Sequence, residues 1–487
     1  MTTRLAPGDT HATALDEPGG LRPSLVPLTA VLAALCALVA ARPLKDNSFL
    51  THLATGRLVL SEGVPDQNPF LFTGTDFPVP SWWWSVVLRI AEIVGGAAGI
   101  RLLTAGVAAA LAVVLVRLAR PTTDAPGAGL LQVVVPVVLT LVCVFDFLSG
   151  RPHLPGFLLL GLAVLVWHEE RSPWWQLPIL LIWVNVHGSW LYGVLVLGAL
   201  AVARAIDDRR IRPRDLQGVG AAVAGVLLGG ALYPNAFEIV LLPTRQFGDP
   251  VEREALSAYQ EWARVPLGEP IAWALAALAA MALWGCVRRR RWAGAVLVLG
   301  LAAMGMSGIR LVPIAAISLV PFAASGLAGV GTLGLPSGSR ARVLLAGSAV
   351  LAIATFGYSI LTPGYILDPY PTEAVDWLEA RDLVANDRVR LVSHDFVGNY
   401  LEWRYGADAH AYVDDRPDAA TLIDYRRLNK LEPGWAGALD RAEADVVLWD
   451  SEKPLVERLA EDPAWLRAVE LDGFTVLCRV ELAGRCT

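Results

Sequence analysis

The stretch from residue 25 to residue 41 reads LVPLTAVLAALCALVAA and contains no charged side chain. A helix needs about 20 mostly apolar residues to cross the hydrocarbon core of a bilayer, and runs of this kind recur along the chain to about Leu361. The many later runs favour a retained first helix over a cleaved signal peptide. Over its 487 residues the chain is 55% hydrophobic and only 18% charged, with a mean hydropathy of +0.49. These features predict an α-helical polytopic membrane protein.

Three regions with different composition divide the chain. Residues 1–23 are rich in Pro, Gly, Thr and mixed charge, and we predict a disordered cytoplasmic tail. Residues 24–363 form the predicted transmembrane domain, with a first outer loop at 43–97. Residues 364–487 are charged throughout, and helical segments alternate there with apolar strand-like runs, which predicts a soluble α/β domain. We predict about eleven transmembrane helices, at 24–42, 98–117, 130–146, 154–168, 173–186, 188–204, 217–234, 270–287, 292–306, 309–326 and 343–361.

Arginines are concentrated in alternate short loops, and this pattern predicts the orientation. The positive-inside rule makes such loops cytoplasmic. A multi-pass protein of the plasma membrane is therefore expected, with a cytoplasmic N-terminus and an extracytoplasmic C-terminal domain. Outside the cytoplasm, Cys478 and Cys486 either form a disulfide or stay free thiols. The arginines in question are Arg117, Arg120, Arg171, Arg204, Arg209, Arg210, Arg212, Arg214, Arg288–Arg291, Arg340 and Arg342.

Ionisable and polar residues gather on the opposite face, in or beside the predicted spans. Charged groups in such positions are costly and are candidates for function by default. The set follows the first, third and fifth predicted spans, continues in a long loop and ends at the start of the tenth span. Its members are Asp46, His52, Asp146, Arg151, His153, Asn185, His187, Glu261, Trp262 and Arg310.

Each member also has a purely structural interpretation. Asp46 could cap a helix that begins near Asn47, which is about as expected as a catalytic role. His52 could lie on the wet face of an amphipathic helix along the membrane surface. Arg151 and Arg310 could snorkel or pair with a carboxylate, although the arginine fork also suits phosphate. The shared location of these residues is therefore the stronger argument for function.

The stretch Asp46-Asn-Ser-Phe-Leu-Thr-His52-Leu-Ala-Thr-Gly-Arg57 resembles the first outer loop of bacterial polytopic membrane glycosyltransferases of the GT-C fold, close to the glycosyltransferase 39 and mannosyltransferase type. Short further matches extend the resemblance over nearly the whole chain. They are Arg151-Pro-His153, Trp183-Val-Asn185-Val-His187, Glu261-Trp262, Arg310 before Pro313, Asp395-Phe-Val-Gly398-Asn-Tyr400-Leu401 and Val413-Asp414-Asp415-Arg416.

The resemblance implies a polyprenyl-phosphate-sugar donor that enters from the bilayer and an extracytoplasmic glycan or protein acceptor. It implies that Asp46 is the base that deprotonates the acceptor hydroxyl, and it raises a divalent cation, Mg or Mn, as a cofactor with unassigned ligands. Cations would take up the negative charge of the leaving phosphate. No nucleotide cofactor is expected from the glycine spacing, and the net charge of −6 gives no reason to expect nucleic acid. The implied substrate-binding residues are His52, Arg151, His153, Asn185, His187, Glu261, Trp262 and Arg310.

The chain also departs from that family pattern. Ser48 stands where relatives commonly carry a second acidic residue, and Ser81-Trp-Trp-Trp84 stands where they tend to show histidine-glutamate-tryptophan. A non-catalytic relative that binds lipid-linked sugar or acts as a scaffold is therefore the alternative function. A lipid or polysaccharide transporter ranks last, because it would place polar residues near the bilayer centre. The Asp414–Arg416 segment fits a buried ion cluster as well as an acceptor contact.

Overall fold

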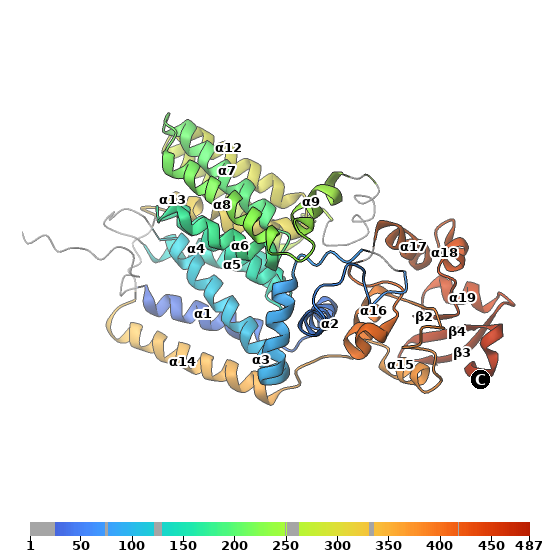
Figure 1. Ribbon diagram of the computed structural model, residues 1–487. Helices are drawn as coiled ribbons and strands as arrows, with labels where there is room; N and C mark the ends of the chain where they lie inside the picture. Colours follow the sequence, from blue (N-terminus) through green and yellow to red (C-terminus); the bar gives the residue numbers. More distant parts are fainter. Residues whose placement is uncertain are drawn as a thin grey trace, which may run out of the picture.

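The computed structural model describes residues 25–73, 76–120, 129–248, 250, 263–330, 336–416 and 418–487. Figure 1 shows a bundle of long helices with a smaller α/β domain at one end, here called the domain end. Helix α2 lies between the bundle and this domain (Figure 1). The helices before the domain are α1 (Val26–Ala40), α2 (Asn47–Ser61), α3 (Trp82–Leu118), α4 (Leu130–Val144), α5 (His153–His168), α6 (Gln176–Val186), α7 (Trp190–Asp207), α8 (Pro213–Ala231), α9 (Glu238–Gly248), α11 (Pro270–Arg288), α12 (Trp292–Met306), α13 (Val312–Gly326) and α14 (Gly338–Leu361).

Each of the eleven predicted spans overlaps a helix, and the mostly helical membrane architecture is confirmed. In the described part of the chain, six helices are long and apolar enough to cross a bilayer by themselves, and three further apolar helices are shorter. The total of eleven spans and the orientation stay predictions. The six are Trp82–Leu118, Leu130–Phe147, Trp190–Asp207, Pro270–Arg288, Ile309–Gly326 and Gly338–Leu361, and the three are Val26–Ala40, His153–His168 and Trp292–Met306.

Helix α3 is broken at Gly95 and Gly96, and its two halves pack against different helices. Gly96 has a φ of 58°, a conformation that glycine adopts without the steric cost of a Cβ. Before the break, α3 packs so closely on α2 that a Cβ on Gly56 would lie 2.2 Å from the carbonyl oxygen of Ser85. After the break, Arg101 is fully buried and donates to the carbonyl oxygen of Ala41 at 2.6 Å. The two halves therefore hold α2 and α1, respectively.

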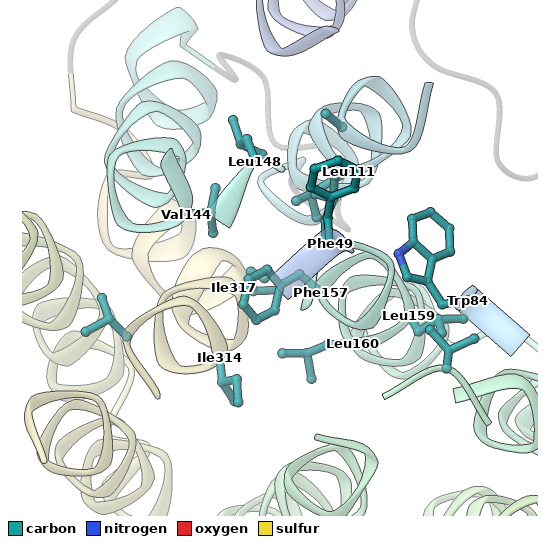
Figure 2. Packing of buried hydrophobic residues seen from close by; sticks show 14 of the residues in the cluster. Phe49, Trp84, Leu111, Val144, Leu148, Phe157, Leu159, Leu160, Ile314 and Ile317 are labelled. Atoms are coloured by element: carbon teal, nitrogen blue, oxygen red, sulfur yellow. The ribbon is translucent and has the colours of Figure 1, made fainter. Parts of the chain in front are cut away.

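An apolar core fixes the start of α2 against the bundle. Figure 2 shows Phe49 of α2 among buried side chains of the bundle, including Leu111, Phe157 and Ile317. Phe49 is 2% exposed, and its ring stacks on that of Tyr365 with centroids 5.7 Å apart. Burying a phenylalanine side chain contributes about 1.5–3 kcal/mol. The residues just before Phe49 are thereby held in one place.

The C-terminal domain contains a four-stranded mixed sheet in the order β1-β2-β4-β3. Strands β1 (Leu391–Ser393) and β2 (Val446–Asp450) are parallel, whereas β4 (Phe474–Arg479) runs antiparallel to both β2 and β3 (Trp465–Leu471). The small C-terminal sheet confirms the mixed helix and strand content expected there. The helices of the domain are α15 (Thr372–Glu379), α16 (Asp395–Tyr405), α17 (Ala419–Lys430), α18 (Trp435–Arg441), α19 (Pro454–Ala460) and α20 (Ala483–Cys486).

Cys478 of β4 and Cys486 of α20 form a disulfide, with Cα atoms 6.6 Å apart. Of the two alternatives left open by the sequence, the structure therefore has the paired state. Cys36, Cys143 and Cys286 are free and buried, as expected of small apolar groups in spans.

A buried ion cluster docks the C-terminal domain on α2 and the loop that follows it. Arg416 donates to Asp414 at 2.7 Å, to Glu402 at 2.7 Å and to the Thr55 hydroxyl of α2 at 2.6 Å. Asp414 also accepts from the Asn68 amide at 3.3 Å. Burial raises the pKa of Glu402 well above its usual value. Burial also acts to raise the pKa of Asp414, but the charge of Arg416 and the hydrogen bonds to this carboxylate together lower it. Two carboxyl groups contact the Arg416 guanidinium, so the buried arginine is compensated.

Candidate functional site

Asp46 and Arg151 form an ion pair at the domain end. The Arg151 Nε lies 2.6 Å from Oδ1 and 2.5 Å from Oδ2 of Asp46. Asp46 also caps α2, because its side chain accepts from the backbone N–H of Ser48 at 3.1 Å. The capping interpretation of Asp46 is therefore correct in geometry, and it does not remove a chemical role. The side chains of Asp46 and Arg151 are 25% and 18% exposed, respectively, so the pair is partly accessible.

The C-terminal domain places a second carboxylate residue, Asp415, near the start of α2. Burial raises the pKa of Asp415, while the charge of Arg151 acts in the opposite direction. Its position is fixed by Asn399 of α16, whose Oδ1 accepts from the backbone N–H of Asp415 at 3.1 Å and from the Thr51 hydroxyl at 2.7 Å. Hydrogen bonds of Asn399 thus join the two parts of the molecule at their junction.

A cavity of about 580 Å³ opens beside these residues. Its wall comes from the segment that joins α1 to α2, from the segment between α4 and α5, and from the C-terminal domain. Three basic and two acidic side chains line it, which leaves one net positive charge and suits an anionic ligand. They are Arg42, Lys45 and Arg151 against Asp46 and Asp146, with Tyr370 and Phe396 on the domain side.

Two histidines, His153 and His187, pack against each other, and His153 follows Arg151 by two positions. The rings of His153 and His187 lie 4.4 Å apart between centroids. His153 is 6% exposed, and neither of its ring nitrogens has a hydrogen-bond partner among the described residues. His52 of α2 lies within electrostatic reach of His187 and Arg151. Buried polar atoms are rarely left without partners, so His153 is poised to bond a ligand.

The protonation of two of these histidines follows from their surroundings. Burial, together with the charges of Arg416 and Arg151, lowers the pKa of His52 to about 3, so its ring is neutral. His187 Nδ1 accepts from the backbone N–H of Ser189 at 3.1 Å. The Ser189 hydroxyl, 2.6 Å from the same nitrogen, accepts in turn from the Trp183 indole at 3.1 Å. This chain of bonds places the proton of a neutral His187 on Nε2.

The remaining predicted residues occupy different places. Arg310 lies in the short turn η4 (Ile309–Leu311), and its charge acts on His153. Asn185 is fully buried behind the site: Trp82 donates to its oxygen at 2.8 Å, and its nitrogen donates to the carbonyl oxygens of Leu181 and Gly229. It therefore joins α3, α6 and α8. Glu261 and Trp262 lie outside the described residues.

Sequence reasoning did not single out several residues that line the site. Arg42 and Lys45 lie four and one positions before Asp46, and both line the cavity. The available signal in the sequence was this pair of basic residues at the end of the first predicted span. Asp415 was singled out only as part of an ion cluster or an acceptor contact. Tyr370, whose ring stacks on that of Tyr400 at 5.3 Å, gave no signal in the sequence.

The family resemblance raised a divalent cation as a cofactor. The described side chains can therefore be checked for a set of ligands that would bind such an ion. Within the described ranges, no three His, Cys, Asp or Glu side chains come together as a group that could hold a metal ion. Both oxygens of Asp46 are instead close to the Arg151 guanidinium. The described residues therefore do not fit a resident metal, and no step is derived through one.

No protein-family model matches the chain, and no curated protein matches it in sequence. Among solved structures it is similar to an oligosaccharyltransferase from Archaeoglobus fulgidus, at 12% sequence identity. The structure of that protein, AglB, with an inhibitory peptide and a dolichol-phosphate aligns over 87% of this chain and 69% of that chain, with a TM-score of 0.53. Two further structures, one tethered to an acceptor peptide and one in the apo form, align over 88% and 70% with TM-scores of 0.53 and 0.50. The fold is therefore GT-C-like, that of a class of membrane glycosyltransferases.

Proposed function

We propose that this chain is an inverting membrane glycosyltransferase that transfers a sugar from a polyprenyl-phosphate donor to an acceptor of the cell envelope. The observation that carries the proposal is the ion pair of Asp46 and Arg151 on the wall of a charged cavity, beside a buried His153 whose ring nitrogens have no partner among the described residues. The GT-C-like fold supports it, since the similar archaeal protein was solved with a dolichol-phosphate and a peptide.

The reaction uses these residues in the following order. The acceptor hydroxyl oxygen attacks the anomeric carbon while its proton passes to the Asp46 carboxylate. The bond between that carbon and the phosphate oxygen breaks, and its electron pair leaves with the lipid phosphate. Arg151 and Arg310 face the negative charge that develops there, and His153 and the Nε2–H of His187 supply hydrogen bonds.

Placement of the site outside the cytoplasm is part of the proposal. The arginine-rich loops lie between spans on the side that the positive-inside rule makes cytoplasmic. The disulfide of Cys478 and Cys486 supports an oxidising compartment for the C-terminal domain. A glycan or protein outside the cytoplasm would then be the acceptor, and the donor lipid would enter from the bilayer.

The test is glycosyl transfer by the purified full chain in nanodiscs, offered a panel of radiolabelled polyprenyl-phosphate sugars. We expect transfer by the wild type and a loss of at least about 100-fold in Asp46→Asn, because the base is removed while the amide can still cap α2. Asp440→Asn, which changes an exposed carboxylate of the C-terminal domain, is the matched control. Unchanged turnover in Asp46→Asn would remove the base assignment.

A non-catalytic relative that binds lipid-linked sugar is the second candidate. The close contact of Arg151 with both oxygens of Asp46 favours it, because both carboxylate oxygens are then engaged by the guanidinium instead of facing an acceptor hydroxyl. Binding of the labelled donor without transfer, across the whole panel, would support this candidate over the enzyme.

A further inference from the structure

The cavity at the domain end keeps a positive charge after its ion pair is taken into account. Arg151 and Asp46 pair with each other, which leaves the charges of Arg42, Lys45 and Asp146 on the wall. In the part of the chain that the structure describes, no carboxylate forms an ion pair with Arg42 or Lys45. Two cations and one carboxylate thus remain, so a ligand with one negative charge would balance the wall.

Two further features of the wall suit a bound sugar. Ser149 is part of the wall, and its hydroxyl is buried without a hydrogen-bond partner among the described residues. A serine hydroxyl changes direction by rotation about a single bond, so it can turn to a ligand in the cavity. The rings of Tyr370 and Phe396, here called the aromatic wall, lie 6.1 Å apart between centroids on the domain side. Ligand sites typically combine such an apolar surface with a few polar groups that orient the ligand.

The cavity lies on the side of the proposed base. In an inverting displacement, the attacking oxygen and the leaving oxygen are on opposite faces of the sugar ring. Asp46, which would take the acceptor proton, is part of the cavity wall. Three residues that would serve the leaving phosphate are not part of it, namely His153, His187 and Arg310. The acceptor is therefore expected in the cavity, and the donor phosphate on the histidine side of the Asp46–Arg151 pair.

We propose that this cavity is the acceptor site and that it takes a glycan with an anionic group, a phosphate or a carboxylate. Arg42 and Lys45 bind that group, because a neutral glycan would leave their charges without a counter-charge. A sugar ring of the acceptor lies against the aromatic wall while one of its hydroxyls meets Asp46. The inference rests on the proposed function, since only transfer makes the ligand of this cavity an acceptor.

The first test measures binding and does not depend on catalysis. The purified full chain in nanodiscs of zwitterionic lipid is offered glucose 6-phosphate, glucuronate and glucose in turn. Saturation-transfer difference NMR then measures the contact of each sugar with the protein. We expect signals from the two anionic sugars that are at least about 5-fold stronger than the signal from glucose. The stronger of the two identifies phosphate or carboxylate as the preferred group.

Matched variants decide whether the cavity is the place of binding. Arg42→Gln/Lys45→Gln should lose the preference for anionic sugars, whereas Arg388→Gln/Lys430→Gln should keep it. The control pair removes the same two charges from exposed positions of the C-terminal domain that are not part of the cavity wall. Equal signals from all three sugars with the wild type, or an unchanged preference in the first double variant, would overturn the inference.

The second test uses transfer to an oligosaccharide that carries the preferred group and to the same oligosaccharide neutralised by methylation. In Arg42→Gln/Lys45→Gln we expect the KM for the anionic acceptor to rise at least about 10-fold, while the KM values for the donor lipid and the neutral acceptor change less than about 2-fold. A rise in the donor KM instead would assign the two cations to the lipid phosphate and overturn the inference. Absence of transfer with every donor would count against the proposed function, and the NMR preference would still decide whether the cavity binds an anionic sugar.

Discussion

His153 combines burial with two ring nitrogens that have no partner among the described residues, and this makes its replacement informative. Its ring packs near those of Phe147 and Phe157, at centroid distances of 5.7 and 6.3 Å. Leaving a buried polar group without a bond costs about 1–3 kcal/mol. We therefore expect His153→Phe to keep or raise the Tm of the chain in nanodiscs, while the KM for the donor lipid rises at least about 10-fold.

Asn185→Leu provides the contrast for this prediction. The three hydrogen bonds of Asn185 are all made within the fold, so its replacement leaves the Trp82 indole without its acceptor and removes one donor from each of two carbonyl oxygens. We expect a lower Tm for this variant. A fall in Tm for His153→Phe, with an unchanged donor KM, would show that His153 is a packing residue only.

At the scale of single residues, the sequence predicted which residues lie on one face but not which of them bond to each other. Asp46, Arg151, His153 and His187 were predicted to lie on one face because hydropathy assigns them to loops of one side. The hydropathy pattern gives no distances, so it left the bond between Asp46 and Arg151 open. The bond between Asn399 and Thr51 could not be predicted, because it depends on how the C-terminal domain docks.

Helix α16 crosses the segment before Asp415 at a distance that only glycine permits. A Cβ on Gly398 would lie 1.9 Å from the carbonyl oxygen of Val413. Gly398→Ala must push the two segments apart, and such overpacking costs about 1–3 kcal/mol. We expect a lower free energy of unfolding in chemical denaturation of the full chain, together with reduced transfer, because Asn399 moves away from Asp415 and α2.

Gly484→Ala is the matched control in the same domain, because a Cβ there meets no atom within 4 Å. It should leave both stability and transfer within the error of the wild type. Equal stability of the two variants would indicate that α16 can shift without cost, and that the close crossing does not position the site.

Some helices and strands were predicted from the sequence and others were missed, for different physical reasons. Long apolar runs gave the helices of the bundle, including those of the short spans. Strand β3 was missed, because Trp465–Leu471 mixes charged and apolar residues at the edge of the sheet and is formed by pairing with β4. Its hairpin turns at Asp472 and Gly473, with φ values of 52° and 76°. Within α16, the stretch from Asp395 to Leu401 was noted only as a sequence motif and was not predicted to be a helix. Its buried polar residues interrupt the apolar face that would have indicated one.

The stability of the whole molecule should depend on acid through His394, which is 4% exposed and stacks on Trp449 at 4.0 Å. Burial lowers its pKa from 6.5 to about 4. Between these values the unfolded chain binds more protons than the folded one, so stability is complete above pH 6.5 and falls as the pH drops toward 4. The loss is roughly 3 kcal/mol for this residue, at 1.36 kcal/mol per pKa unit.

The measurement is tryptophan fluorescence during chemical unfolding of the full chain in nanodiscs, between pH 4.5 and 7.5. In His394→Gln the slope of stability against pH should be smaller in that window, and the two proteins should converge in slope above it. Identical slopes would show that His394 titrates normally in the folded chain.

The junction of the bundle with the C-terminal domain also bears on the order in which the protein matures. Asp46 and Arg151 leave the ribosome long before Tyr370 and Phe396, so a nascent chain holds a partial site for much of its synthesis. Membrane insertion of the bundle would precede the arrival of the aromatic wall. For the proposed function and orientation, activity would begin only after the C-terminal domain has crossed the membrane, folded and docked on α2, and incomplete chains in the bilayer would not turn over the lipid donor.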